Sequence, residues 1–270
     1  MSHSVISLGL GLGGGKSATS SGAPSGGGGG TPFANTKSVT FDGVDDYATF
    51  TPGTIAATDD YTLSMWLNGR SFSALAFALS DPYLACLSLQ SGNVFFQTRT
   101  TSSYSYGTKT VITGASVDTW YHLAVVKQAN VPSGSTTFTY YVNGSSVGTN
   151  VHGTVAETFA FGKANGTPFL MQLGRYSGNA FYINGLIDEL AIFTSIPSGR
   201  SGALDATAIS GIWGGGTPSS LSTLAPRNWY RMGDGDEAGS GTTVYDMGSA
   251  GGGTTDMTLE NAVYSTDVPS

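Results

Sequence analysis

From Ser38 onward, apolar and polar residues alternate in short runs that turn-forming residues interrupt. Residues 61–68, YTLSMWLN, show the period of two that places alternate side chains on opposite faces of a β-strand. Other runs rich in β-branched and aromatic residues lie at 119–128, 136–143 and 169–175. Further short strands are expected at 38–50, 72–80, 84–90, 93–99 and 109–113. The pattern predicts a chain built almost entirely from short strands.

The turns and the single helical pattern indicate the same fold class. Asn143-Gly144 separates FTYYV from SSVGT and predicts a hairpin, because a type I′ turn requires positive φ at both central residues. Only residues 204–213, LDATAISGIW, predict a helix, with Asp205 as N-cap and glycines after its end. Many strands, 40 glycines and little helix predict an all-β sandwich of two sheets.

Length and charge exclude several functions. A chain of 270 residues buries a substantial core, and its net charge of −7 gives no electrostatic footprint for nucleic acid or an anionic membrane surface. No stretch approaches the ~18 apolar residues of a membrane-spanning helix. We therefore expect partners that are neither nucleic acid nor membrane.

Several segments, in this order, resemble one family. They are VTFDGVDDYATF (39–50), YTLSMWLNG (61–69), DTWYHLAVVKQ with TFTYYVNGSSVGT (within 118–149), LGRYSGNAFYINGLIDELAIF (173–193) and the closing stretch 228–269. Together they resemble the concanavalin A-like, laminin G-like jelly-roll domains, which include the pentraxin-like ones. The resemblance implies a two-sheet antiparallel jelly-roll sandwich over residues 37–270, with a final strand beside the first. It also implies recognition of carbohydrate or protein at loops, in some members through calcium.

Residues 1–36 form a Gly/Ser-rich N-terminal arm or linker that cannot bury enough surface to fold alone. Apolar residues recur near its start with a period close to two, which suits a strand added to the sheet edge of a partner: Val5, Ile6, Leu8, Leu10 and Leu12. Jelly-roll domains with such arms are similar to surface proteins of tailed-phage virions, either capsid decorations or fibre and tail-associated subunits. That resemblance implies a non-enzymatic virion structural protein that contacts other virion proteins through its arm, forms a homo-oligomer and displays its lectin-like domain to a host-surface glycan. The alternative is a carbohydrate-binding module of a secreted or surface bacterial protein, located outside the cell or on its surface.

Asp188 and Glu189 interrupt the apolar run NGLIDELAIF. Burying an unpaired carboxylate costs several kcal/mol, so the pair needs an explanation. Neighbouring strand residues face opposite sides of a sheet, whereas glycoside hydrolysis needs two carboxyls on one side of the bond. The alternating Glu-x-Asp-x-x-Glu of retaining hydrolases on similar jelly-rolls is also absent. We therefore expect no enzymatic activity.

Three interpretations of Asp188 remain open. It accepts backbone N–H groups of the turn FDGVDD and fastens the closing strand to the opening one. It shares a calcium site with Asp42, Asp45 and Asp46, because hard cations bind carboxylate and carbonyl oxygens. Or it is exposed at a sheet edge. Glu189, on the other face, is expected to be solvated or paired with an arginine such as Arg175.

Loop aromatics are the candidates for ligand binding, because tyrosine rings stack on sugars and offer a hydroxyl. The candidate residues are Tyr104, Tyr106, Arg175, Tyr176 and Asn179. Ordinary surface or intersubunit packing is the alternative. A second acidic stretch, residues 232–246, is expected to be a solvated turn, with a bound cation as its alternative.

Overall fold

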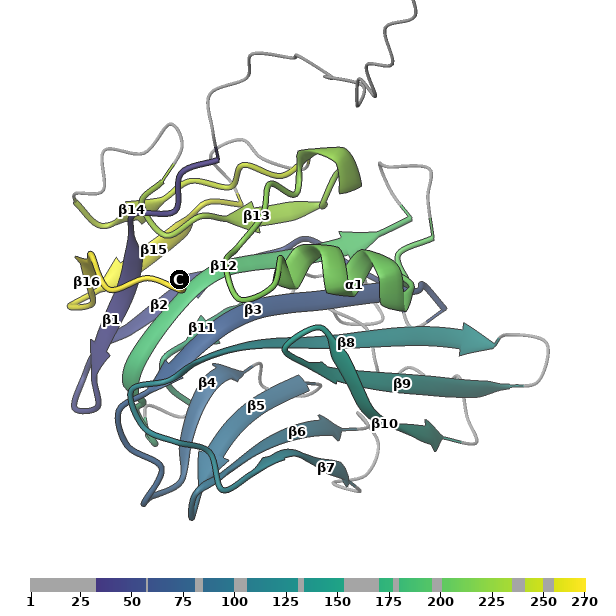
Figure 1. The fold of residues 1–270 in the computed structure, drawn as a ribbon, viewed down its shortest axis with the longest axis horizontal. Helices are drawn as coiled ribbons and strands as arrows, with labels where there is room; N and C mark the ends of the chain where they lie inside the picture. Colours follow the sequence, from purple (N-terminus) through teal and green to yellow (C-terminus); the bar gives the residue numbers. More distant parts are fainter. Residues whose placement is uncertain are drawn as a thin grey trace, which may run out of the picture. The chain divides into compact units, whose positions relative to one another are not determined.

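The computed structural model describes residues 33–56, 58–80, 85–99, 106–130, 134–152, 170–176, 180–195, 201–234, 241–249 and 255–270. They fold into two antiparallel sheets of eight strands each, stacked as a sandwich (Figure 1). Sheet A runs in the order β10 (Ser145–His152), β9 (Ser135–Val142), β8 (Trp120–Asn130), β3 (Tyr61–Gly69), β12 (Asn184–Thr194), β1 (Ser38–Asp42) and β16 (Val263–Ser265), with β13 (Asn228–Tyr230) also paired to β12. Sheet B runs β14 (Thr243–Val244), β15 (Met257–Glu260), β2 (Tyr47–Phe50), β11 (Met171–Leu173), β4 (Ala76–Ser80), β5 (Ala85–Gln90), β6 (Asn93–Arg99) and β7 (Tyr106–Thr113). The predicted all-β jelly-roll sandwich is confirmed.

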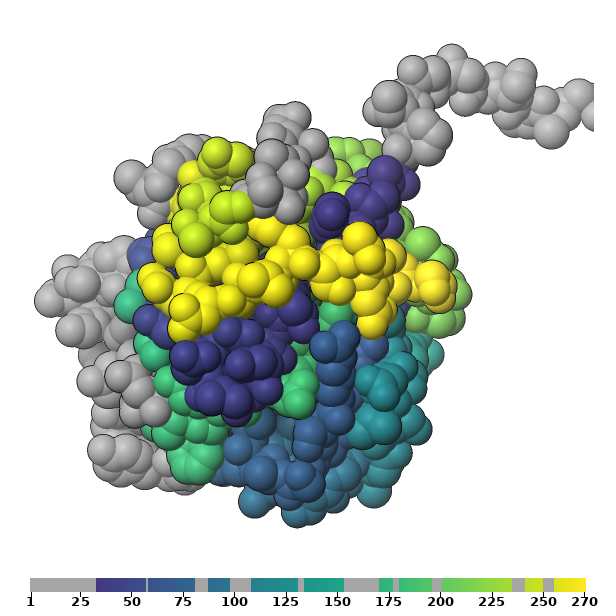
Figure 2. Space-filling view, turned by 90° about the vertical axis from the view of Figure 1, so that its left-hand side faces the viewer, coloured from purple at the N-terminus to yellow at the C-terminus, as the bar shows by residue number. Residues whose placement is uncertain are grey.

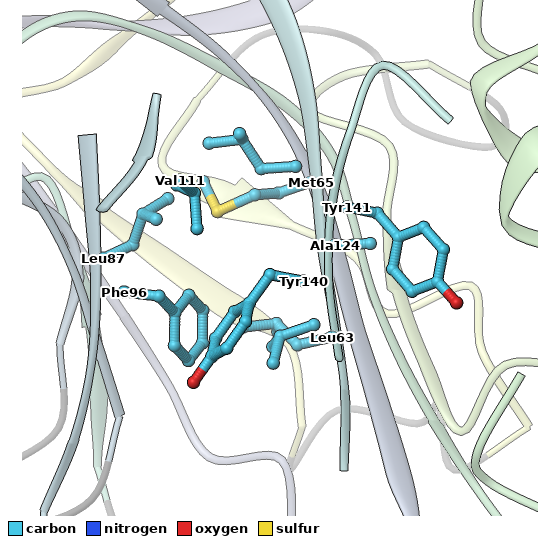
Figure 3. A pocket seen from close by; sticks show the side chains of 10 residues that line it. Leu63, Met65, Leu87, Phe96, Val111, Ala124, Tyr140 and Tyr141 are labelled. Atoms are coloured by element: carbon cyan, nitrogen blue, oxygen red, sulfur yellow. The ribbon is translucent and has the colours of Figure 1, made fainter. Parts of the chain in front are cut away.

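The core lies between the sheets because alternate strand residues face inward. Leu63, Met65 and Leu67 of β3 belong to this inter-sheet core, as do Leu87 and Phe96 of sheet B. A small hollow remains in it, and Leu63, Met65, Leu87, Phe96 and Tyr140 point into it from the two sheets (Figure 3). Such a lining offers little to the hydroxyls of a sugar, so we look for a ligand site on the outer faces.

The outer face of sheet A is covered by the helix α1 (Ala206–Trp213). Asp205 caps the helix by accepting a hydrogen bond from the backbone N–H of Ala208 at 2.8 Å, and Gly214 ends it in the left-handed conformation. Ile209 and Ile212 of α1 form a second apolar cluster with the outward-facing side chains of sheet A. The predicted helix and its cap are confirmed, and a short 3-10 turn follows at Ser222–Leu224.

The predicted hairpin at Asn143-Gly144 is also confirmed. Both residues have positive φ, 48° and 74°, between β9 and β10. A Cβ on Gly144 would lie 2.9 Å from the Trp213 ring, so glycine is required both by the turn and by the helix packed on it.

The end of the chain returns to its beginning. β16 pairs with β1 and β15 with β2, so the C-terminal residues lie against the N-terminal strands (Figure 2). The compact unit is residues 33–270, because four residues before the predicted boundary at 37 already pack on the sandwich. The predicted arm anchors, Val5 to Leu12, lie outside the described residues. No helix in the described part of the chain is long and apolar enough to span a membrane.

Candidate functional site

A β-bulge in β12 places both acids of the NGLIDELAIF run on one side of the sheet. Asp188 pairs with Trp66 and Ala191 with Ser64, so β12 has one residue more than β3 over this stretch. Glu189 is the extra residue, with φ of 47°. Ile187 and Leu190 on either side both belong to the inter-sheet core. The prediction that the two acids face opposite sides is therefore wrong: both lie on the outer side of sheet A.

Asp188 fastens the fold, but not to the predicted turn. It has no exposed surface, and it accepts hydrogen bonds from Asn35 Nδ2 at 3.0 Å and from the backbone N–H of Glu189 at 2.8 Å. β1 pairs Val39 with Ile187, whereas its other end, Asp42, pairs with Asn184. Asp188 thus lies at the opposite end of β1 from the FDGVDD turn, and the structure does not bring it to the other predicted metal ligands. The interpretation as an exposed residue is wrong.

Glu189 is neither solvated nor paired with Arg175. It is 3% exposed, and its carboxylate accepts a hydrogen bond from Trp229 Nε1 at 2.5 Å and pairs with Arg231 Nε at 3.2 Å. An arginine partner was expected, but the partner is Arg231, which follows β13. The short strand β13 is what carries Trp229 to the position next to the bulge.

The segment Phe33–Lys37, which we call the arm root, closes over these groups. The Asp234 carboxylate accepts hydrogen bonds from Thr36 N at 2.7 Å, Thr36 Oγ1 at 2.6 Å and Lys37 N at 3.1 Å. Arg231 donates to the carbonyl of Ala34, and its guanidinium lies 4.2 Å from the Phe33 ring centroid. The arm root is therefore held by two acids, Asp188 and Asp234, and by Arg231, which pairs with Glu189.

At Asp234 and Asp246 the acidic stretch 232–246 is not solvated as the sequence predicts, whereas Asp236 and Glu237 lie outside the described residues. Asp234 is 6% exposed and Asp246 is 7% exposed. Asp246 accepts hydrogen bonds from Asn228 Nδ2 at 2.6 Å and from Trp229 N at 2.8 Å. Both carboxylates satisfy donors within the fold, which explains why they are buried.

The buried acids give a pH prediction with a definite sign. Burial raises the pKa of Asp188 well above its usual range, and the charge of Glu189 raises it further. Burial also raises the pKa of Glu189, to about 7, against the lowering effect of Arg231. An acid whose pKa is raised by folding binds its proton more tightly in the folded state, so its contribution to stability falls as pH rises. Asp188→Asn, which has no proton to lose, is expected to gain stability relative to the wild type as pH rises from about 4, the ordinary range of an aspartate pKa, towards neutral.

Denaturant unfolding of both proteins across this pH range measures the difference. His122 has the opposite effect on stability, because burial lowers its pKa to about 3, but it is common to both proteins and cancels. The exposed Asp118→Asn is the matched control and should show no such trend. A difference between Asp188→Asn and the wild type that stays constant or shrinks with rising pH would contradict the raised pKa.

The structure describes some of the predicted ligand residues and not others. Tyr104 and Asn179 lie outside the described residues, and Tyr106 is placed only as the first residue of β7. Arg175 and Tyr176 lie in the turn that follows β11. This turn is tied to β4, since the Arg175 carbonyl accepts from Ser80 Oγ at 2.8 Å and Gly174 N donates to Ala78 O at 3.0 Å.

Three aromatic rings, Phe77, Tyr176 and Phe181, form a cluster that we call the aromatic platform. The centroids of Phe77 and Tyr176 lie 5.0 Å apart, and Phe181 lies 6.1 Å from the first and 6.3 Å from the second. Phe77 stands between Ala76 and Ala78, which belong to the inter-sheet core, so its ring is on the outer face of sheet B. The platform therefore lies on the opposite side of the sandwich from the arm root.

Phe181 is the exposed part of the platform and has an unusual backbone. It is 48% exposed and has φ of 58°. Positive φ is a genuine outlier for a bulky side chain, and it persists only where the surroundings impose it. Here its carbonyl accepts a hydrogen bond from Phe77 N at 3.0 Å, and Tyr176 N donates to Ala180 O at 2.9 Å. The turn thus holds a strained aromatic residue toward solvent.

Arg175 lies beside the platform on the same face. Its guanidinium carbon is 3.2 Å from the Tyr47 ring centroid, and its Nε donates to Gln172 Oε1 at 2.8 Å. Gln172 separates two core residues of β11 and Tyr47 precedes a core residue of β2, so both point outward from sheet B.

Asp42, Asp45 and Asp46 gather in the loop between β1 and β2. One carboxylate oxygen of each lies within 4.8 Å of the others. The Asp42 carboxylate accepts from Val44 N at 2.7 Å, which lowers its pKa, and Asp46 accepts from Asp42 N at 2.8 Å. Burial raises the pKa of Asp46. Three of the four predicted metal ligands are therefore close enough for one cation, and Asp188 is not among them.

Sequence reasoning missed Phe77, Phe181, Tyr47 and Gln172. Phe181 lies within the quoted segment GRYSGNAFY, but the sequence carries no signal that a phenylalanine adopts positive φ. The other three belong to strands. Such a residue becomes a candidate for ligand binding only when the structure shows which face of its sheet packs in the core and which faces outward.

Comparisons with known proteins agree with the fold. A family model described as the concanavalin A-like lectin/glucanases superfamily matches residues 42–199. No curated protein sequence matches the chain. The crystal structure of a candidate carbohydrate-binding protein from Bacteroides ovatus is similar with 16% identity and a TM-score of 0.61, over 88% of this chain and 62% of its own. This chain therefore spans less than two thirds of that protein's length.

Two other solved structures share parts of the architecture. A heptameric SAP-like pentraxin from Limulus polyphemus is 14% identical with a TM-score of 0.48, over 66% of this chain and 82% of its own. The CBM40 of a Ruminococcus gnavus IT-sialidase, bound to α2,3-sialyllactose, is 13% identical with a TM-score of 0.44, over 64% of this chain and 96% of its own.

Proposed function

The chain belongs to the concanavalin A-like lectin/glucanase superfamily, and we propose that it binds glycans on the aromatic platform of sheet B. The observation that carries the proposal is Phe181, which is 48% exposed with φ of 58° beside Tyr176 and Phe77. Aromatic rings stack on the apolar faces of sugars, and the tyrosine hydroxyl adds a hydrogen-bonding group. Strained residues are often found at ligand-binding sites, where the strain preorganises the contact.

In this proposal the protein binds glycans and does not catalyse a reaction on them. The two acids that interrupt the apolar run are 0% and 3% exposed and are occupied by Asn35, Trp229 and Arg231. A carboxylate must reach the reacting bond to act as acid, base or nucleophile, and these two lie beneath the arm root. Their role in the proposal is to hold the fold.

We further propose that the chain is a structural protein of a tailed-phage virion, either a capsid decoration or a fibre or tail-associated subunit. Residues 1–36 supply a glycine-rich arm, and its root is fixed to the outer face of sheet A. The platform lies on the outer face of sheet B, so attachment through the arm leaves the binding face free for a host-surface glycan. Other virion proteins and further copies of the chain are the proposed partners. In the alternative, the same domain serves a secreted or surface bacterial protein.

Calcium is the proposed cation of the Asp42, Asp45 and Asp46 loop. Their carboxylate oxygens, within 4.8 Å of one another, are the ligand type that calcium prefers. The three carboxylates would hold the ion, and the ion would neutralise their concentrated negative charge next to Tyr47.

A glycan array probed with the full-length protein tests the binding proposal. Phe181→Ala is expected to weaken binding to the best glycans by about thirtyfold, because losing a central aromatic anchor costs about 2 kcal/mol. The same arrays read with added calcium and with a chelator test the cation, whose removal should weaken binding.

Val263→Ala is the matched control, because Val263 is 57% exposed but lies on β16 of sheet A. It should bind as the wild type does. Equal binding by Phe181→Ala and the wild type, or no glycan bound by either, would refute the proposed site.

A further inference from the structure

Arg175 is a preorganised cation on the binding face. It is 9% exposed, with one face of the guanidinium stacked on Tyr47 and its Nε bonded to Gln172. These contacts fix the plane of the group and occupy one of its five N–H donors. The four donors of the two terminal nitrogens are left for another partner.

Among the described residues, no acid forms an ion pair with Arg175. The ion pairs of the described residues are Arg70 with Asp267 and Arg231 with Glu189, and neither includes Arg175. Of the side-chain nitrogens of Arg175, only Nε has a hydrogen bond among the described residues, to Gln172. Burying nine tenths of a guanidinium that has no acid partner in the described part of the chain is costly for folding, and an anionic ligand would offset that cost.

We propose that the glycan carries a carboxylate, as uronic and sialic acids do, and that Arg175 binds it. The inference rests on the proposed function. The planar fork of a guanidinium matches a carboxylate through two parallel hydrogen bonds, and stacking on an aromatic ring holds that fork in place. Because Arg175 directly precedes Tyr176 in the chain, a sugar ring on the platform brings an attached carboxylate within reach of it. In this proposal the aromatic platform binds the sugar ring, and Arg175 favours sugars that carry a negative charge.

The surrounding charges restrict the ligand further. Asp42, Asp45 and Asp46 lie within the five residues before Tyr47, and the whole chain carries a net charge of −7. The three aspartates and the net negative charge would repel every sulfate of a densely sulfated polymer. A single carboxylate meets this repulsion once, and its two hydrogen bonds to the Arg175 guanidinium offset it. The expected ligand class is therefore a glycan with separated acidic sugars.

Pairs of glycans that differ in a single group test the inference on the wild-type, full-length protein. Sialylated and uronic acid oligosaccharides are compared with their carboxyl-reduced forms by calorimetry. The acidic member of each pair is expected to bind about tenfold more tightly or better, as for one charged hydrogen-bonded contact. This comparison needs no variant and is independent of any effect on folding.

Two variants then assign the effect to Arg175. Arg175→Gln should lose the preference, so that it binds the acidic and the reduced member of each pair with equal affinity. Arg175→Lys should recover only part of the preference, because an ammonium is a point charge without the fork.

The outcomes separate the inference from the function on which it rests. Equal wild-type binding of acidic and reduced glycans, with dependence on Phe181 intact, overturns the carboxylate and leaves glycan binding standing. Preference for sulfated over carboxylated glycans overturns it as well. No binding of any glycan overturns the proposed function itself.

Discussion

Replacing Arg231 with alanine is expected to lower the free energy of unfolding by about 3–5 kcal/mol, the range for removing one partner of a buried ion pair. Glu189 would keep a carboxylate that is 3% exposed and lose its only cation among the described residues. The arm root would also lose the donor to Ala34 and the cation that stacks on Phe33. Denaturant unfolding followed by fluorescence and circular dichroism measures the loss.

Arg70→Ala is the matched control. Arg70 also pairs with an acid, Asp267, at 3.9 Å, but the two side chains are 41% and 49% exposed. Exposed pairs contribute about 0–1 kcal/mol, so this variant should stay near the wild type. Adding Glu189→Gln to the Arg231→Ala variant removes the unpaired carboxylate. If this restores part of the unfolding free energy, the unpaired carboxylate accounts for that part of the loss. Equal, small losses in both arginine variants would contradict the buried pair.

Removing the arm root is expected to cost as much as losing the arginine. A protein that begins at Ser38 lacks the Asn35 bond to Asp188 and the Thr36 and Lys37 bonds to Asp234. Because each hydrogen bond to a charged group contributes about 1.5–3 kcal/mol, the expected loss is about 3 kcal/mol or more. A protein that begins at Phe33 retains all these contacts and should match the full chain in unfolding free energy.

The Phe33 protein also tests the virion proposal. If the arm carries the attachment, this stable protein should fail to enter particles when it is supplied with the other virion components. Incorporation at the level of the full chain would place the attachment on the sandwich. A Ser38 protein as stable as the Phe33 protein would show that the arm root contributes nothing to the fold.

The sequence predicts those parts of the structure that depend on local patterns. The period-two runs gave the strands, Asn143-Gly144 gave the type I′ hairpin, and Asp205 gave the helix cap. Each depends on a few consecutive residues, so it can be read without knowing what packs against it.

The errors arise where distant segments meet or a local rule is broken. The opposite-face argument for Asp188 and Glu189 failed because a bulge inserts Glu189 at positive φ, which no residue type signals there. The partner of Asp188 is Asn35, 153 positions away, in a segment whose composition indicates a linker. For the binding face, sequence reasoning found Arg175 and Tyr176 but not Phe181, because exposure and strain are set by the tertiary turn.

Mapping of backbone amide shifts in the Phe33–Ser270 protein, titrated with a glycan that the array selects, tests the central claim most directly. We expect the shift changes to gather at Phe77, Arg175, Tyr176 and Phe181, on the outer face of sheet B. The arm root and β16 should stay unchanged. Shift changes centred on sheet A, α1 or the arm root, with no change at the aromatic platform, would contradict the proposed binding face.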